Sequence, residues 1–294
     1  MKHRSADLLL TASAPIVWGS TYIVTTEFLP GFEPMTVAVL RALPAGLLLL
    51  LIARQLPSGI WWLRSLVLGA LNFSVFLSLL FVATYRLPGG VAATVGAIQP
   101  LLVALLAPVL LGTPLRIKSL VAGLAGIMGV GLLVLAPESK LDGLGVAAAL
   151  GAAASMALGN ILVRRWRPSV SMVTLTAWQL CLGGLLLVPL VLLFDPVIPA
   201  LSPTNLLGLA WLGVIGSALT YTLWFRGIGR ISPVIVSSLL FLSPLTAVLL
   251  GWVFLGQSLG AIQLAGIGVI CASVWAGTRP SGTLNPRRAV NSEA

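Results

Sequence analysis

Charge is scarce in this sequence, and its scarcity excludes most classes of protein. Only 8% of the 294 residues are charged, whereas a soluble protein has about 25%. Hydrophobic residues make up 58% of the chain, and the mean hydropathy is +1.07. Such a chain cannot present most of its surface to water, so we exclude a cytosolic enzyme, a nucleic-acid-binding protein and a disordered chain.

Histidine and cysteine, the usual ligands of transition metals, are nearly absent. The single histidine, His3, lies in the N-terminal tail, and Cys181 and Cys271 lie within apolar runs. We therefore expect no metal site, disulfide framework or buried histidine proton relay. The sequence also lacks an H-E-x-x-H motif, paired catalytic aspartates and a Walker loop, so neither catalysis nor a cofactor is expected.

Long apolar runs dominate what is present. A helix needs about 20 apolar residues to cross a bilayer. Proline, glycine or charge divides the chain into ten such runs, at about 8–28, 35–53, 64–85, 89–111, 116–135, 144–163, 170–194, 205–225, 232–255 and 259–276. The first is not expected to be a cleaved signal peptide, because its apolar core before Pro15 is too short. The sequence predicts an all-α integral membrane protein in which residues 1–294 form a single transmembrane domain.

The net charge of +10 is distributed unevenly between the two sides that these helices define. With the N-terminus in the cytoplasm, Arg86 and Lys140 are the only basic residues outside, and fourteen lie inside: Lys2, Arg4, Arg54, Arg64, Arg116, Lys118, Arg164, Arg165, Arg167, Arg226, Arg230, Arg279, Arg287 and Arg288. Because basic loops stay in the cytoplasm, we expect both termini there, including the tail 277–294. The expected location is a cell membrane, such as a bacterial inner membrane.

The two halves of the chain repeat each other. Glycine, proline and arginine recur 144 positions apart, as in Gly69/Gly213, Arg86/Arg230, Pro100/Pro244 and Gly112/Gly256, and other pairs recur at 138, such as Thr36/Thr174 and Gly46/Gly184. Each half, about 8–135 and about 144–276, holds five predicted helices. Since five is odd, the second half enters the membrane from the opposite side. Inverted repeats of this kind surround a central cavity in alternating-access carriers.

Several short motifs resemble one family. They are Trp18–Tyr22 (WGSTY), Arg41 within Val39–Leu43 (VLRAL), and the two proline helices that end in Leu111-Gly112 and Leu255-Gly256. Together they resemble the EamA branch of the drug/metabolite transporter superfamily, and the chain is similar to its YddG-type amino-acid exporters. The resemblance implies ten helices in two inverted halves, a central substrate cavity and export. Many relatives have glutamate after the Leu-Gly pair, where this chain has Thr113 and Gln257, so no role of that glutamate carries over.

Two features of the spans carry alternative interpretations. Pro100 and Pro244 occupy equivalent positions, and each is either a hinge or a static bend. Arg41 is the one ionisable side chain within a span, and it is either a clamp for an anionic substrate group or the partner of Glu27 in a structural ion pair. Because Arg41 lies only about two turns inside its helix, the ion pair is the favoured interpretation.

Uncharged polar and aromatic side chains complete the predicted substrate site. The candidates can donate or accept hydrogen bonds or stack on a substrate, although each alone is more often a packing residue: Trp18, Tyr22, Asn72, Phe76, Gln99, Asn160, Trp178, Tyr221 and Ser238. No aspartate or glutamate lies in the middle of a span, so we expect no obligatory proton coupling through a carboxylate. Without a fixed countercharge, broad recognition of neutral amino acids, including aromatic ones, is expected.

Other functions remain open at this stage. Efflux of drugs or other metabolites is the first alternative, and a channel, a lipid scramblase or an intramembrane enzyme is the alternative from another class. The expected partners are a small-molecule substrate and the bilayer. The oligomeric state is left open, and a monomer fits the sequence.

Overall fold

The computed structural model describes residues 2–87, 89–134, 142–167, 169–195, 199–256 and 259–278. Within these ranges every regular element is helical, as the apolar runs predict. The elements of the first half are α1 Lys2–Gly19, α2 Thr21–Phe28, α3 Pro34–Ala53, α4 Trp61–Gly69, η1 Ala70–Ser74, α5 Val75–Arg86, α6 Gly89–Gly96, α7 Gln99–Leu111 and α8 Ile117–Val134. Those of the second half are α9 Gly143–Trp166, α10 Met172–Phe194, α11 Pro203–Ala210, η2 Trp211–Leu219, α12 Thr220–Arg230, α13 Pro233–Ser238, η3 Leu239–Phe241, α14 Leu242–Leu255 and α15 Ala261–Thr278.

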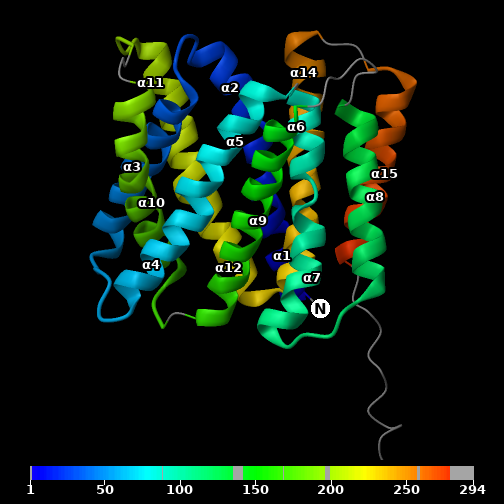
Figure 1. Ribbon diagram of the computed structural model, residues 1–294, viewed down its shortest axis with the longest axis horizontal. Helices are drawn as coiled ribbons and strands as arrows, with labels where there is room; N and C mark the ends of the chain where they lie inside the picture. Colours follow the sequence, from blue (N-terminus) through cyan, green and yellow to red (C-terminus); the bar gives the residue numbers. More distant parts are fainter. Residues whose placement is uncertain are drawn as a thin grey trace, which may run out of the picture.

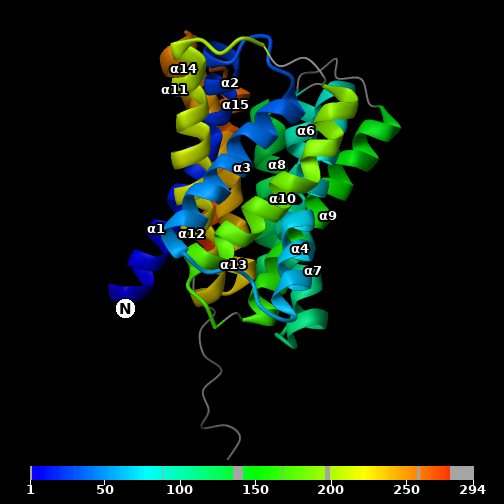
Figure 2. The same ribbon diagram turned by 90° about the vertical axis from the view of Figure 1, so that its left-hand side faces the viewer.

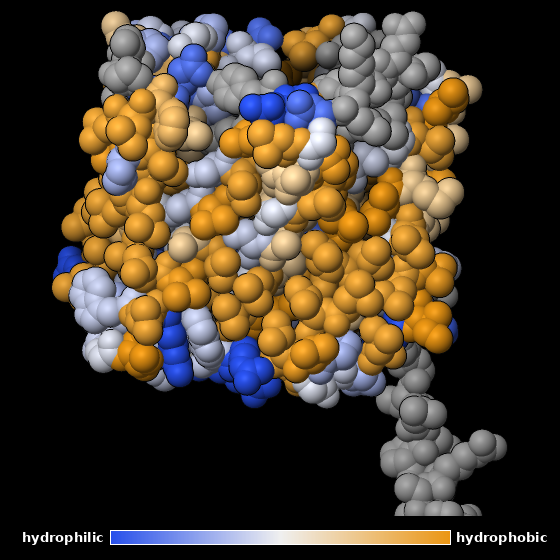
Figure 3. All heavy atoms as spheres, viewed as in Figure 1, coloured by the Kyte–Doolittle hydropathy of each residue, from blue (hydrophilic) through white to orange (hydrophobic). Residues whose placement is uncertain are grey.

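These helices form one bundle with an apolar outer surface. Figures 1 and 2 show them running between the same two ends of the molecule, and in Figure 2 the first turns of α1 extend away from the rest. Hydrophobic residues form a broad band on the face shown in Figure 3, with hydrophilic residues mostly above and below it. Large apolar side chains of the described helices face outward, such as Val109 at 80% exposure. A lipid environment explains this exposure, because hydrocarbon solvates such side chains as well as a protein core does.

Nine spans in the described part of the chain are long and apolar enough to cross a membrane. They confirm the membrane class of the fold. The remaining expected span, about 8–28, is divided at Ser20 into α1 and α2, and its count as the tenth crossing stays a prediction.

Contacts between the halves are reciprocal, as two copies related by a two-fold axis require. A Cβ atom added at Gly46 of α3 would lie 2.6 Å from the backbone nitrogen of Cys181, and one at Gly184 of α10 would lie 2.9 Å from Cβ of Leu43. Gly46 and Gly184 are 138 positions apart, and so are Leu43 and Cys181. Equivalent residues therefore face each other across α3 and α10. Figure 1 shows the corresponding helices of the two halves running in opposite directions, as expected for an inverted repeat.

Irregular helix also recurs at the repeat distance. The third span of each half contains a π-helical segment, η1 in the first half and η2 in the second. When the positions of η1 are shifted by 144, they fall within η2. Gly112 and Gly256 end their helices in the left-handed conformation, with φ of 65° and 63°. The sequence predicted continuous spans at 64–85 and 205–225, and it did not predict the π-helical segments, because they depend on packing rather than on apolar periodicity.

Candidate functional site

The fourth span of each half is interrupted just before its proline. Residues 97–98 separate α6 from α7, and the 3₁₀ turn η3 separates α13 from α14. Pro100 and Pro244 follow these interruptions within the first turn of α7 and α14. Proline cannot donate to the carbonyl four residues earlier, and it disfavours helical geometry in the residue before it. The prolines therefore mark breaks between helices at matching positions of the two halves.

A cavity of about 570 Å³ lies between these two breaks, and we call it the break cavity. Its walls come from α2, α6, α7, α8, η3, α14 and α15 and from the break between α6 and α7: Ile23, Thr26, Ala93, Gly96, Ala97, Gln99, Pro100, Leu133, Val134, Leu240, Phe241, Ser243, Pro244, Ala247, Val248, Gly251, Leu255 and Gln263. Thr26, Val134 and Leu255 lie in the last turns of their helices, at the end of the bundle where α2, α6 and α14 are labelled in Figure 1. The break cavity therefore lies toward that end, which bears Glu27 and Glu33.

The described lining of the break cavity contains no charged residue, and its polar groups are few. Gln99 is 6% exposed, and its Nε2 has no hydrogen-bond partner. Gln263 already accepts a hydrogen bond from the Gly260 nitrogen at 2.8 Å. Buried donors are nearly always satisfied in folded proteins, so an unpaired amide on the wall of a cavity needs a physical explanation. A hydrogen-bond acceptor on a bound molecule is one that the geometry offers.

Phe241 closes one side of the break cavity. Its ring contacts the position where Gly126 of α8 lacks a side chain, so any Cβ atom there would collide with the ring. The same ring packs in a cluster with Val130, Leu245 and Ile270. Sequence reasoning missed Phe241, Ser243 and Thr26. The 144-residue repeat could have indicated Phe241, because it pairs this residue with Ala97 on the other side of the cavity.

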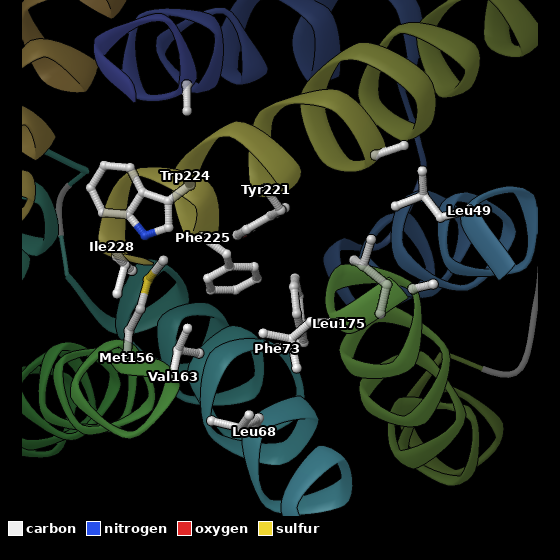
Figure 4. Packing of buried hydrophobic residues seen from close by; sticks show 14 of the residues in the cluster. Leu49, Leu68, Phe73, Met156, Val163, Leu175, Tyr221, Trp224, Phe225 and Ile228 are labelled. Atoms are coloured by element: carbon white, nitrogen blue, oxygen red, sulfur yellow. The ribbon is translucent and has the colours of Figure 1, made fainter. Parts of the chain in front are cut away.

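The structure brings most of the predicted aromatic candidates together elsewhere, in a packed core. Trp18 lies 4.8 Å from Tyr221 and 5.2 Å from Trp224 between ring centroids. Phe73 meets Tyr221 edge-on at 4.7 Å, and Figure 4 shows Tyr221 and Phe225 pointing toward Phe73. None of these five residues lines the break cavity. In this conformation they hold α1, η1 and α12 together.

The buried amides also serve packing contacts here. Asn72 Nδ2 donates to Gln179 Oε1 at 2.8 Å, and Asn160 Oδ1 accepts from Trp224 Nε1 at 3.3 Å. Asn72 Oδ1 lies against Gly159, where a Cβ atom would collide with it. These contacts join η1 to α9 and α10 through residues that are almost wholly buried.

The remaining candidates make separate contacts, and Trp178 and Phe76 belong to the same core cluster as Trp18 and Tyr221. Trp178 donates to the Gln55 carbonyl at 2.7 Å, Phe76 is partly buried against the core, and Ser238 donates to the Val234 carbonyl at 3.0 Å. Tyr22 belongs to α2, and its side chain lies outside the described part of the structure. Of the predicted site, the break cavity brings together Gln99, Pro100 and Pro244.

Arg41 does not form the favoured ion pair with Glu27. Its Nε donates to Ser217 Oγ and its NH2 group to the Gly216 carbonyl, each at 3.1 Å, and the described ion pairs do not include it. Trp18 Nε1 donates to the same Gly216 carbonyl at 3.1 Å. Both acceptors belong to η2, whose wider turns disturb the regular helical hydrogen bonding. Arg41 and Trp18 thus stabilise the π-helical segment, and Glu27 is exposed.

At the opposite end of the bundle, ion pairs and tight packing join α1 to α12. The Asp7 carboxylate lies 2.7 Å from an Arg226 nitrogen and 3.5 Å from one of Arg230, joining the start of α1 to α12. Beneath this contact, the Thr11 side chain fills the space that Gly227 leaves open. The break cavity and this contact therefore lie at opposite ends of the molecule.

Comparison with known proteins identifies the family. The model of the EamA-like transporter family matches residues 5–135 and again residues 143–277. The chain belongs to this family. Both halves of the protein are thus copies of one transporter module, and the chain is a multi-span membrane protein of a transporter family.

Individual relatives agree over nearly the whole chain. The chain is 48% identical to Protein PecM of Dickeya dadantii, over 86% of each protein. It is 28% identical to the uncharacterized inner membrane transporter YedA of Escherichia coli K12, over 88% of this chain and 86% of YedA. It is 26% identical to a probable amino-acid metabolite efflux pump of Salmonella typhimurium, over 92% of this chain and 93% of the pump. A solved crystal structure shares the fold with a TM-score of 0.82 at 19% identity, over 93% of this chain and 96% of that one.

Proposed function

We propose that this transporter exports neutral amino acids and similar small amphiphilic solutes by alternating access, and that it binds them in the break cavity. The observation that carries the proposal is the unpartnered amide of Gln99, buried in an uncharged cavity between two equivalent helix breaks. A carboxylate or carbonyl oxygen of the solute satisfies this donor, and the apolar walls accommodate its side chain. The relative from Salmonella typhimurium is named a probable amino-acid metabolite efflux pump, and this name supports the proposed substrate class.

The uncharged lining also favours transport without a carboxylate that takes up a proton. A solute with no net charge avoids the large cost of burying an unpaired ion. A cationic drug would need an acidic partner, and none is among the described lining residues. Amino acids are therefore preferred over hydrophobic cations as substrates, and drug efflux is the second candidate. Neither a channel nor a scramblase needs two matched helix breaks.

The proposed cycle uses the two ends of the bundle alternately. The break cavity serves the side that bears Glu27, and closure through Asp7 and Arg226 seals the other side. We place the basic side in the cytoplasm of a cell with an inner membrane, because Arg54, Arg116, Lys118 and Arg164 follow the positive-inside rule. The tail residues 279–294, together with Lys140 and Gln257, lie outside the described part of the chain. The second conformation exchanges the roles of the two halves.

Counterflow in liposomes that contain the purified protein tests the proposal. Labelled phenylalanine and leucine are expected to accumulate against preloaded unlabelled amino acid, with saturation, and without a pH or sodium gradient. Flux that stays zero until a pH gradient is imposed contradicts uncoupled transport. Flux that is linear in concentration contradicts a carrier and indicates a channel. Saturable transport of ethidium-like cations, with no amino-acid flux, would favour the drug-efflux alternative.

A further inference from the structure

A second and larger hollow lies near the basic end, on the side of the bundle formed by α8 and α15. It has a volume of about 780 Å³, and we call it the α8–α15 groove. Its walls are apolar and come from both halves, with Ala104 of α7 and Ala122 of α8 in the first, and Ile235 of α13 and Ala272 of α15 in the second. Figure 1 shows α7, α8 and α15 on the same side of the molecule.

The groove is continuous with the surface that faces lipid. Ile117 and Val121 of α8 and Trp275 of α15 line it, with exposures of 74%, 59% and 59%. These side chains are large, apolar and directed outward, so hydrocarbon rather than water is the solvent that suits them. Tryptophan is also enriched where the hydrocarbon meets the headgroups. An acyl chain can therefore enter the groove sideways from the bilayer.

One end of the groove is positively charged. Arg116 and Lys118 line it beside the hydroxyl-bearing Thr113 and Ser119, and both basic residues are exposed. Neither takes part in an ion pair among the described residues. Among the described residues, Asp7 is the one carboxylate at the basic end of the bundle, and it is bound by Arg226 and Arg230. The protein thus leaves two neighbouring positive charges available to an external anion.

We propose that the α8–α15 groove binds one anionic glycerophospholipid. Its phosphate lies at Arg116 and Lys118, and an acyl chain lies along the apolar walls. Charge complementarity selects the anionic headgroup, because basic clusters between transmembrane helices on the cytoplasmic side attract such lipids. Since the walls belong to both halves, the lipid would bridge the two repeats. The proposal is independent of which solute the protein transports.

Native mass spectrometry of the detergent-purified protein tests this binding. Phosphatidylglycerol and phosphatidylcholine with the same acyl chains are titrated separately, and free glycerol phosphate is a third probe. We expect one phosphatidylglycerol to bind in preference to phosphatidylcholine, more weakly in high salt, and glycerol phosphate not to bind. Equal binding of the two lipids overturns the proposal, because it indicates ordinary annular lipid. Tight binding of glycerol phosphate also overturns it, because it indicates a soluble-anion site.

Variants separate the groove from the general charge of the surface. Each charge removed by Arg116→Gln and Lys118→Gln is expected to weaken phosphatidylglycerol binding about fivefold. Ala272→Trp fills the groove without changing charge and is expected to weaken binding at least as much. Arg54→Gln, which removes an exposed arginine at the end of α3, is the matched control and is expected to have no effect. If Arg54→Gln weakens binding as much as Arg116→Gln, the lipid is not held in this groove. The two charge variants test the site even if Ala272→Trp fails to fold.

Discussion

At the scale of single residues, the buried polar groups that hold helices together differ from the one unpaired polar group that lines the break cavity, among the five side-chain atoms without a partner in the described part of the chain. Asn72, Gln179 and Asn160 are buried and paired with other side chains. The Gln99 amide nitrogen is equally inaccessible and has no partner. Leaving a buried donor unsatisfied costs stability, so an unpaired donor is expected where it binds a ligand. The two kinds of residue are therefore expected to respond to substitution in opposite ways.

Gln99→Leu is expected to impair transport without lowering stability. It removes the unpaired donor but keeps a similar volume, so the thermal unfolding midpoint should be unchanged or higher. The loss of one hydrogen bond to the substrate, worth about 1 kcal/mol, raises the half-saturating concentration about fivefold. Counterflow and thermal unfolding of the same preparation measure both effects. A lower midpoint with unchanged half-saturation would assign Gln99 a structural role.

Gln179→Leu is expected to show the opposite behaviour. It removes the acceptor of the Asn72 amide in a region with no access to solvent. A buried donor left unpaired costs about 1 to 3 kcal/mol, so the unfolding midpoint should fall by several degrees. The substrate concentration at half-saturation should stay unchanged, because neither residue lines the break cavity. A variant as stable as the parent would argue against this hydrogen bond.

Glycines at helix crossings form a third class of residue, and two of them make a matched pair. Gly46→Ala is expected to destabilise the protein by about 1 to 3 kcal/mol, because its methyl group would meet the backbone of Cys181. Gly268→Ala, on α15, meets nothing within 4 Å and should be neutral or stabilising, because alanine favours helix. Thermal unfolding measures both variants. Equal midpoints would mean that α3 and α10 are not in close contact.

At the scale of the helix, the fourth span of each half consists of two pieces. The interruptions at residues 97–98 and 239–241 begin 142 positions apart and end 143 positions apart, and each precedes a proline. Broken helices at equivalent positions are typical of carriers, because the broken region exposes backbone groups to a cavity and permits the two pieces to move separately. The sequence left hinge and static bend as alternatives for both prolines, and we propose the hinge.

Pro100→Ala together with Pro244→Ala tests the hinge. Alanine restores the N–H that proline lacks, which favours a continuous helix across each break. We expect the exchange rate in counterflow to fall several-fold while the equilibrium affinity for substrate changes little. Pro189→Ala, within the uninterrupted helix α10, is the control and should leave the rate unchanged. A double variant that exchanges substrate at the parental rate would show that the prolines are static bends.

At the scale of the whole molecule, the two ends of the bundle differ. The break cavity serves one end, while the other is held by Asp7, Arg226 and Arg230. An alternating-access carrier needs such an asymmetry in each state, and it must be able to reverse it. The ion pairs at Asp7 are partly shielded from solvent, with the Asp7 side chain 15% exposed, so in the proposed cycle we expect them to favour closure of the basic end.

Asp7→Asn is expected to shift this equilibrium toward opening of the basic end. A cysteine placed at Thr11, which is wholly buried beneath the ion pair, should then react faster with a water-soluble thiol reagent in a Cys271→Ser background. The expected increase is on the order of threefold, because partly exposed ion pairs contribute little. Asp142→Asn removes the Arg86–Asp142 pair near the other end and should leave the rate unchanged. Equal rates in all three proteins would show that Asp7 does not control access.

The sequence by itself determined the class and symmetry of this protein. Apolar runs leave a chain no alternative to helices in lipid, because every backbone group must be paired within the segment. The repeated Gly46/Gly184 and Pro100/Pro244 pairs, spaced by 138 and 144 residues, revealed two copies of one module, and the five spans predicted for each copy led us to expect their inversion.

Only the tertiary structure decided which polar residues face a cavity. Gln99 and Asn72 look alike in the sequence, as amides within apolar runs, but the packing of η1 against α10 pairs the amide nitrogen of Asn72, whereas the amide nitrogen of Gln99 stays unpaired beside the helix break. Likewise, the sequence favoured Glu27 as the partner of Arg41, and the carbonyl and hydroxyl of η2 take its place, while a role as a clamp for an anionic substrate group stays a prediction. A side chain's partner depends on neighbours distant in the chain, and apolar periodicity carries no information about them.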